Sequence, residues 1–271
     1  MSLHPTQHPR RWAAFILTVA ASGLLAGCNA PAPAEDGEWL PSALADDAGD
    51  LPEGREIVQR MIDFMTGNPE LAFEARVTWE SVQESGQKLH FDMLQRVAIR
   101  KPDQIFWVTL RDDATVDSAW YDNGRFSMIR QPDNIWGQIR IPGAIPEMVE
   151  ELVDNYMVDV PFPDILGGDP QEVWLGDDVT SVWYVGEAWV NGGWTDHVAI
   201  RRPGADIQIW VQQGDPFPAK LVIVFIEDEG MPAYIARFSK WATTLPADPR
   251  LFQFTPPPEA ERIDVVPVIR P

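Results

Sequence analysis

The strongest pattern in the chain is a two-residue alternation of apolar and polar side chains across residues 71–101. In its first half the apolar positions are Leu71, Phe73, Ala75, Val77 and Trp79. Such alternation is typical of a strand with one buried and one solvated face. After a turn at Ser85-Gly86, a second alternating run includes Leu89, Phe91, Met93, Val97 and Ile99. The pattern predicts a long antiparallel hairpin, which should curve because sheets twist, and whose apolar face needs a cover.

Two segments with helical spacing are predicted to supply that cover. The first begins at Pro52-Glu53 and ends near Gly67, with apolar residues three and four positions apart. The second covers residues 145–158, with Pro146 in its first turn and acidic residues opposite its apolar stripe. Residues 161–168 follow as a short apolar turn or lid.

The remaining segments predict further antiparallel strands. One lies at residues 105–110, and Asn123-Gly124 is a strong hairpin signal in the strands that continue to residue 141. Later strands, each bounded by turn residues, are predicted at 179–190, 194–202, 206–213, 219–228 and 233–243. Residues 251–254 form a last short element, and the tail after residue 258 is expected to be loose. The predicted fold is mainly β (α+β): a large curved antiparallel sheet, or half-open β-barrel, with helices covering its concave face.

The N-terminal residues predict export rather than a membrane span. Arg10 and Arg11 precede an apolar run that is shorter than the roughly 20 residues needed to cross a bilayer. The run ends in Leu25-Ala26-Gly27-Cys28, which resembles the lipobox of bacterial lipoproteins. That resemblance implies cleavage after Gly27 and lipidation of Cys28, and Asn29 in the next position favours the periplasmic side of the outer membrane. The alternative is a plain secretory signal with a chance cysteine.

These signals divide the chain into four parts. Residues 1–27 form the predicted signal peptide, and residues 28–50, rich in Pro, Ala, Asp and Glu, form a disordered tether. Residues 51–258 contain one domain, because no linker-like composition interrupts them. Residues 259–271 form the C-terminal tail.

Charge and cysteine content narrow the possible partners. The chain has 41 acidic and 21 basic residues and a formal net charge of −20, so nucleic acid is a poor partner. Anionic lipid surfaces should also repel it, which makes an acyl anchor necessary for residence at the membrane. Cys28 is the sole cysteine, so a disulfide within the chain is excluded. We expect a monomer.

The sequence offers little for catalysis. After the signal peptide the histidines are His90 and His197, and neither has a nucleophile or carboxylate at a spacing that suggests an active site. Acidic pairs fall at strand ends, where solvated turns are the ordinary interpretation. No cofactor, metal site or enzymatic activity is predicted.

The order of the elements resembles the DUF2092 family of predicted periplasmic proteins, within the LolA/LolB-like superfamily. The residues that carry the resemblance lie at 83–89 (Gln-Glu-Ser-Gly-Gln-Lys-Leu), 100–103 (Arg-Lys-Pro-Asp), 121–124 (Tyr-Asp-Asn-Gly) and 160–164 (Val-Pro-Phe-Pro-Asp). The resemblance covers roughly residues 51–258 and implies a half-open antiparallel barrel closed by helices. Better-known members of the superfamily bind the acyl chains of lipoproteins or glycolipids in that barrel.

The apolar face of the hairpin and of the second helix therefore gives a candidate ligand site. The predicted lining residues are Phe73, Val77, Trp79, Phe91, Met93, Ile99, Met148, Leu152 and Met157. They would hold an acyl chain, a lipid or a lipoprotein, and the protein would act as a carrier or chaperone. Periodicity does not distinguish residues that line a cavity from residues that fill a core. A second hypothesis is an envelope assembly protein that binds its partner through its sheet surface or edge, with no small-molecule ligand.

Overall fold

The structure is a computed structural model that describes residues 52–166 and 168–268. The predicted signal peptide, the tether and Cys28 lie outside the described residues.

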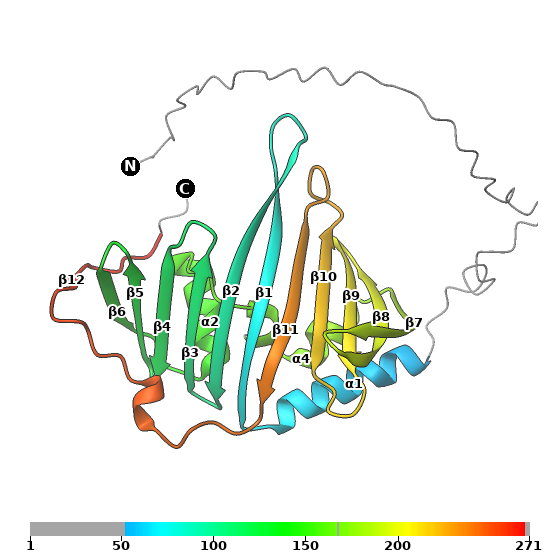
Figure 1. Ribbon diagram of the computed structural model, residues 1–271, viewed down its shortest axis with the longest axis horizontal. Coiled ribbons are helices and arrows are strands. Elements are labelled where there is room, and N and C mark those ends of the chain that lie inside the picture. Colours follow the sequence, from blue (N-terminus) through cyan, green and yellow to red (C-terminus); the bar gives the residue numbers. More distant parts are fainter. Residues whose placement is uncertain (1–51, 167, 269–271) are drawn as a thin grey trace, which may run out of the picture. The chain divides into compact units, whose positions relative to one another are not determined.

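Twelve strands form one sheet in the order β12-β6-β5-β4-β3-β2-β1-β11-β10-β9-β8-β7 (Figure 1). Their bounds are β1 (Glu70–Val82), β2 (Lys88–Arg100), β3 (Gln104–Arg111), β4 (Val116–Asp122), β5 (Arg125–Gln131), β6 (Ile135–Arg140), β7 (Ser181–Val190), β8 (Gly193–Arg202), β9 (Ala205–Gln212), β10 (Pro218–Phe225), β11 (Ala233–Ala242) and β12 (Glu261–Arg262). Neighbouring strands pair antiparallel, apart from β12, which runs parallel to β6. The predicted large antiparallel sheet is confirmed.

The long hairpin of β1 and β2 lies near the middle of the sheet. Its two strands pair in register from Glu70 with Arg100 to Val82 with Lys88. The alternation predicted for β1 is present, because Leu71, Phe73 and Val77 are buried on one face. Figure 1 shows the tip of this hairpin extending beyond the neighbouring strands.

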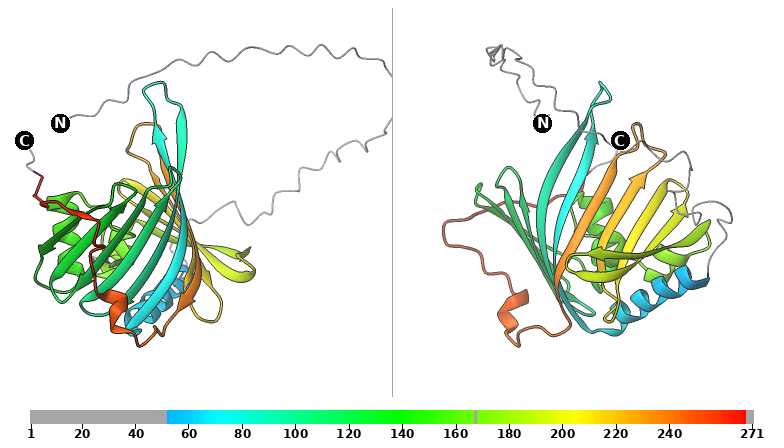
Figure 2. Two further views of the ribbon diagram at one scale, coloured as in Figure 1. Left: turned by 60° about the vertical axis from the view of Figure 1, so that its left-hand side comes forward. Right: turned by 45° about the vertical axis from the view of Figure 1, so that its right-hand side comes forward.

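The helices lie on the hollow face of the curved sheet, as Figure 2 shows. They are α1 (Pro52–Gly67), α2 (Ile145–Tyr156), α3 (Pro163–Leu166) and α4 (Pro170–Leu175), and a short 3-10 helix, η2 (Pro249–Phe252), comes later in the chain. Helix α1 packs against β7, β8, β9 and α4. Helix α2 buries Met148 and Leu152 completely in the main core. The predicted cover of the concave face is therefore present.

Helix α2 begins and ends where its sequence allows. The side chain of Glu147 accepts a hydrogen bond from the backbone N–H of Ala144 at 2.9 Å, which satisfies one of the free donors at the helix start. The helix ends at Met157, whose left-handed backbone (φ 53°) turns the chain away.

The C-terminal residues are bound to the domain, so the prediction of a loose tail was wrong. After β12 pairs with β6, the N–H of Ile263 donates to the carbonyl of Trp136 at 2.8 Å. Val265 then lies over Gly137, where an added Cβ would come within 2.3 Å of its Cγ2 atom. The absence of a side chain at Gly137 leaves room for Val265 to cross it. The sequence did not predict β12 because a strand of two residues is too short to show an alternation of apolar and polar positions. We name residues 261–268 the C-terminal strap.

The opposite, outer face of the sheet has a small core of its own. Residues 245–254 cross it and bury Leu245 and Phe252 against Ala98, and the guanidinium of Arg100 lies 4.9 Å from the centre of the Phe252 ring.

Candidate ligand-binding cavity

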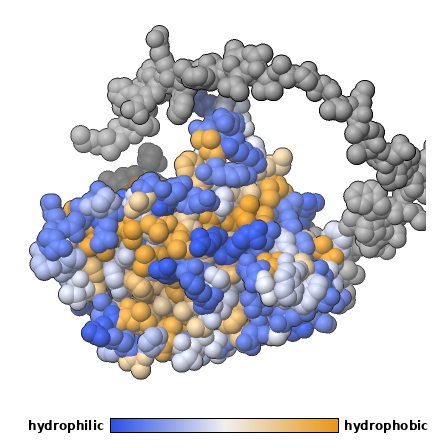
Figure 3. Space-filling view, viewed as in Figure 1, coloured by the Kyte–Doolittle hydropathy of each residue, from blue (hydrophilic) through white to orange (hydrophobic). Residues whose placement is uncertain are grey.

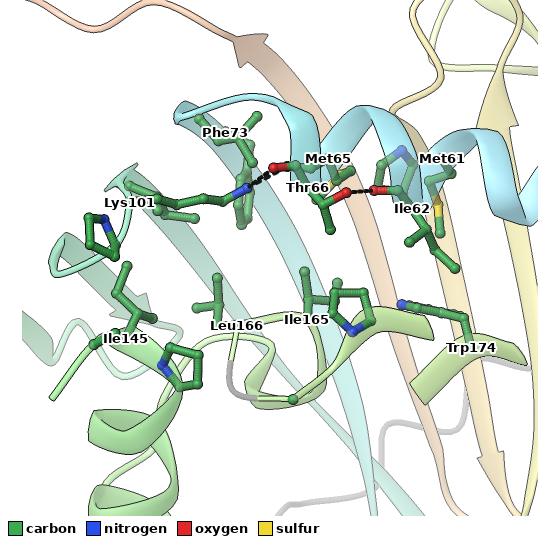
Figure 4. A pocket seen from close by; sticks show the side chains of 18 residues that line it. Met61, Ile62, Met65, Thr66, Phe73, Lys101, Ile145, Ile165, Leu166 and Trp174 are labelled. Atoms are coloured by element: carbon green, nitrogen blue, oxygen red, sulfur yellow. Dashed lines mark hydrogen bonds between the residues drawn. The ribbon is translucent and has the colours of Figure 1, made fainter. Parts of the chain in front are cut away.

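An apolar cavity of about 350 Å³ lies on the hollow face, at the end of the sheet where β1 begins and β2 ends. Figure 4 shows α1 on one side of it and the α3–α4 segment on the other. The lining residues are Met61, Ile62, Met65, Thr66, Leu71, Phe73, Ile99, Lys101, Pro102, Ala144, Ile145, Pro146, Ile165, Leu166, Gly168, Pro170, Trp174 and Pro218. Cavities of this size and character commonly hold small hydrophobic ligands.

Each wall follows from a local sequence feature. The stripe of α1 turns Met61, Ile62 and Met65 towards the sheet, since residues three and four apart share a helix face. On the other side, the carboxylate of Asp169 accepts a hydrogen bond from the backbone N–H of Gln171 at 2.9 Å and starts α4. This positions Trp174, which is buried, as part of the opposite wall.

Among the described residues of the lining Lys101 is the charged one, and its ammonium group is bonded within the protein. Its Nζ atom donates hydrogen bonds to the carbonyl oxygens of Met65 at 2.6 Å and Thr66 at 3.2 Å, at the end of α1 (Figure 4). A cation is favourable there because helix C-termini carry partial negative charge. Burial lowers the pKa of Lys101, because it disfavours the charged form.

Thr66 is satisfied in the same way. Its hydroxyl donates to the carbonyl of Ile62 at 2.7 Å. Since the hydroxyl of Thr66 and the amine of Lys101 are bonded within the protein, the cavity offers a ligand mainly apolar contact.

The histidines of the described residues make their contacts elsewhere in the protein. His90 lies 3.2 Å from Glu80 near the hairpin tip, and His197 is bonded to Gln208 at 3.0 Å and stacked on Trp210. Burial lowers the pKa of His197. Neither histidine lines the cavity. Across the part of the chain that the structure describes, no three His, Cys, Asp or Glu side chains come close enough to hold a metal ion.

The structure divides the predicted lining residues into three groups. Phe73 and Ile99 line the cavity. Val77, Met148 and Leu152 are buried in the main core but do not reach the cavity, and Met93 is half-buried against that core. Side chains therefore form a packed core where α2 covers the hollow face, and the cavity lies beside the first turn of that helix. Residues that fill a core and residues that line a cavity thus both occur on the same face of the sheet.

Three predicted residues are exposed. Trp79 and Phe91 contact each other with ring centres 5.4 Å apart, yet they remain 43% and 37% exposed. They face the expected side of the hairpin, but the hairpin extends beyond the helices that would cover them. Met157 is 69% exposed because the chain leaves the helix at this left-handed residue. The prediction that these three side chains cover a cavity was wrong.

Sequence reasoning missed most of the actual lining. The stripe of α1 was recognised only as a helix face that packs on the sheet. The sequence pattern assigns no role in the lining to Lys101, Pro102 or Trp174. The apolar composition of residues 161–168, interpreted as a turn or lid, was the signal that pointed to Ile165 and Leu166.

Comparison with known families identifies the chain. Residues 54–266 match the family model described as "Predicted periplasmic protein (DUF2092)". The chain belongs to this family. The DUF2092 domain therefore includes the C-terminal strap through residue 266, beyond the predicted boundary at 258. No curated protein matches the sequence.

Several solved structures are similar to this DUF2092 protein. LprF from Mycobacterium bovis is 14% identical with a TM-score of 0.46, and the match covers 78% of this chain and 99% of that one. The lipoprotein LppX from Mycobacterium tuberculosis is 15% identical with a TM-score of 0.43, covering 73% and 99%. A LolA superfamily protein from Nitrosomonas europaea is 5% identical with a TM-score of 0.31, covering 74% and 97%.

The described helices were also compared with the requirements of a membrane span. Within residues 52–166 and 168–268, no helix combines the length and apolar character needed to cross a bilayer.

Proposed function

We propose that this DUF2092 protein is a periplasmic binding protein that holds a hydrophobic ligand, an acyl chain or a lipid, in the cavity between α1 and α3–α4. The observation that carries the proposal is a mainly apolar space of about 350 Å³ in which the hydroxyl of Thr66 and the amine of Lys101 are already bonded within the protein. Such a site binds by burial alone, without chemistry. Its role would be that of a carrier or chaperone.

The expected affinity follows from how many methylenes of the acyl ligand are buried in the cavity. Each methylene removed from water contributes about 0.8 kcal/mol. A chain that buries about eight methylenes would gain about 6 kcal/mol before the cost of immobilisation is subtracted. Micromolar affinity corresponds to about −8 kcal/mol, so the binding of a single acyl chain is expected to be weaker than micromolar.

We further propose that the protein is anchored through Cys28 to the periplasmic side of the outer membrane. The sequence Leu25-Ala26-Gly27-Cys28 supports this, together with Asn29. In cells grown with an alkyne analogue of palmitate, the wild-type protein should incorporate the analogue, and the Cys28→Ser variant should not. Equal labelling of both proteins would contradict the anchor without affecting the cavity.

The cavity is tested with a ligand and a pair of matched variants. Native mass spectrometry of the purified protein should show bound lipid, and a fluorescent fatty acid should compete for the same site. Ile165→Asp introduces a carboxylate into the lining, whereas Val153→Asp introduces the same charge on the exposed side of α2. We expect Ile165→Asp to lose uptake of the fatty acid and Val153→Asp to bind as the wild type does.

Two outcomes would contradict the proposed function. One is a wild-type protein that is free of lipid and takes up no fatty acid. The other is equal loss of uptake in both variants while circular dichroism shows native folds, because binding would then depend on net charge rather than on the cavity.

A further inference from the structure

A row of cations crosses the outer face of the sheet, opposite the helices. Lys220 on β10 pairs in register with Arg237 on β11, and Arg237 pairs with Arg76 on β1. Three basic side chains therefore stand side by side on three neighbouring strands. In Figure 3, strongly hydrophilic residues gather across the middle of this face, with hydrophobic residues around them. We name Lys220, Arg237 and Arg76 the basic row.

The basic row lacks the carboxylates that would normally balance it. Arg76 and Arg237 are exposed and make no ion pair with any residue in 52–166 or 168–268. The neighbouring buried carboxylate of Glu74 is already held by Arg96 and Lys240, each at 3.0 Å. Like charges directly opposite each other on paired strands are unfavourable, and burial together with the charge of Arg237 lowers the pKa of Lys220.

The arrangement is unexpected in a chain with a formal net charge of −20. Basic residues are scarce here, and several others on the sheet bind carboxylates, as Arg201 binds Asp206 at 2.6 Å and Arg202 binds Asp178 at 2.6 Å. Three adjacent cations without a carboxylate partner among the described residues leave a local positive surface, which an external anion would stabilise.

We propose that the basic row is a docking surface for an acidic α-helix of a partner protein. This inference is independent of the cavity, because the row lies on the opposite face of the sheet. The choice of a helix rests on spacing. Neighbouring strands lie about 4.7–4.9 Å apart, so the three cations recur at that interval along a line across the strands.

A helix matches this interval better than an extended peptide does. Residues three and four apart on a helix lie about 5–6 Å apart on one face. An extended chain returns to the same face only every 6.6–6.8 Å or so. Carboxylates at positions i, i+4 and i+7 of a helix lying across the strands can therefore meet all three cations.

The two ends of the row suggest how such a helix continues. Beyond Arg76, the register leads to Leu94 on β2 and to Leu110 on β3, and Leu110 is 41% exposed. At the other end Trp210 contacts Lys220, whose Nζ lies 4.0 Å from the centre of the ring. The partner helix should therefore carry acidic residues in the middle and apolar residues at the end that lies over Leu94 and Leu110.

The test uses the full chain with Cys28→Ser, so that no acyl anchor contributes to binding. The probe is a helix-forming peptide, labelled with a neutral dye, that carries glutamates at i, i+4 and i+7. A second peptide has the same composition with its glutamates distributed around the helix. Fluorescence anisotropy at low and physiological salt should show at least tenfold tighter binding of the first peptide, and weaker binding as salt rises.

Matched variants locate the binding to the row. The double variant Arg76→Ala and Arg237→Ala should lose at least tenfold in affinity, whereas Arg76→Lys and Arg237→Lys should keep most of it because the charges remain. The control is Arg125→Ala with Arg140→Ala. These two arginines also pair across neighbouring strands, β5 and β6, but outside the basic row. The control should bind the peptide within twofold of the wild type.

Three results would overturn the proposal. The first is equal affinity for the two peptides, and the second is equal loss in the test and control double variants while circular dichroism shows native folds. The third is binding of vesicles of phosphatidylglycerol, lost in Arg76→Ala with Arg237→Ala, without binding of either peptide, because the row would then contact a lipid surface.

Discussion

Filling the cavity at Ala144 should abolish ligand binding without harming the fold. Ala144 lines the cavity just before the first turn of α2, with an extended backbone (φ −90°, ψ −173°) that accepts a larger side chain. Its methyl group makes no capping hydrogen bond that a substitution would remove. In Ala144→Phe the ring would occupy part of the 350 Å³.

The expected loss of affinity follows from the number of acyl-chain methylenes that the new aromatic side chain of the Ala144→Phe variant excludes from the cavity. A ring that excludes about four methylenes costs the ligand about 3 kcal/mol of burial, which is roughly a 150-fold loss of affinity. The free protein should be as stable as the wild type or slightly more stable, because filling a cavity restores packing contacts.

The assay is titration with a fluorescent fatty acid, with thermal unfolding measured in parallel. Ala260→Phe serves as the control, since it makes the same change in a turn remote from the cavity. If Ala144→Phe keeps its native unfolding temperature and binds the fatty acid as the wild type does, the ligand is not held in this cavity. Loss of binding in both variants would equally refute the reasoning.

Three further predictions concern the surrounding structure. Lys101→Met keeps the apolar stem but removes the bonds to the end of α1, so the free energy of unfolding should fall by about 1 kcal/mol in urea titrations, with fatty-acid affinity retained. Asp117 is buried on β4, and although burial raises its pKa, the hydrogen bonds from its two arginine partners lower it further. Asp117→Asn should therefore cost about 1.5–3 kcal/mol at pH 7. This difference is fully present above the unfolded pKa of about 3.9 and should decrease as pH falls towards the lower folded pKa, and urea unfolding from pH 7 to pH 3 checks the decrease. Gly137→Ala should release the C-terminal strap, because the new Cβ would lie 2.3 Å from Cγ2 of Val265, and trypsin should then cleave after Arg262 faster than in the wild type.

The sequence predicted the elements well where one period persists over many residues. The alternation of β1 and β2 and the stripes of α1 and α2 gave elements whose bounds agree with the structure to within a few residues. The strap was missed because its contacts depend on the absence of a side chain at Gly137, not on any repeating pattern.

The cavity was harder to predict. Periodicity shows on which face of the sheet a side chain lies, but it does not show whether a helix covers that part of the strand. Phe73 and Trp79 share one face of β1, yet Phe73 is buried and Trp79 is 43% exposed, since the covering helices end between them. Ala75, an obvious candidate for cavity filling on the same face, is fully buried in the core and does not line the cavity. A bulky residue there would overpack the core instead.

The central position of β1 has a consequence for how the chain folds. Its neighbour β2 follows at once, but its other neighbour, β11, begins only at Ala233. Until that late segment arrives, the backbone donors and acceptors that β1 directs towards β11 stay unpaired along a strand with an apolar face. Such an edge invites pairing with other chains, so the nascent protein depends on rapid arrival of its own β11 to avoid aggregation.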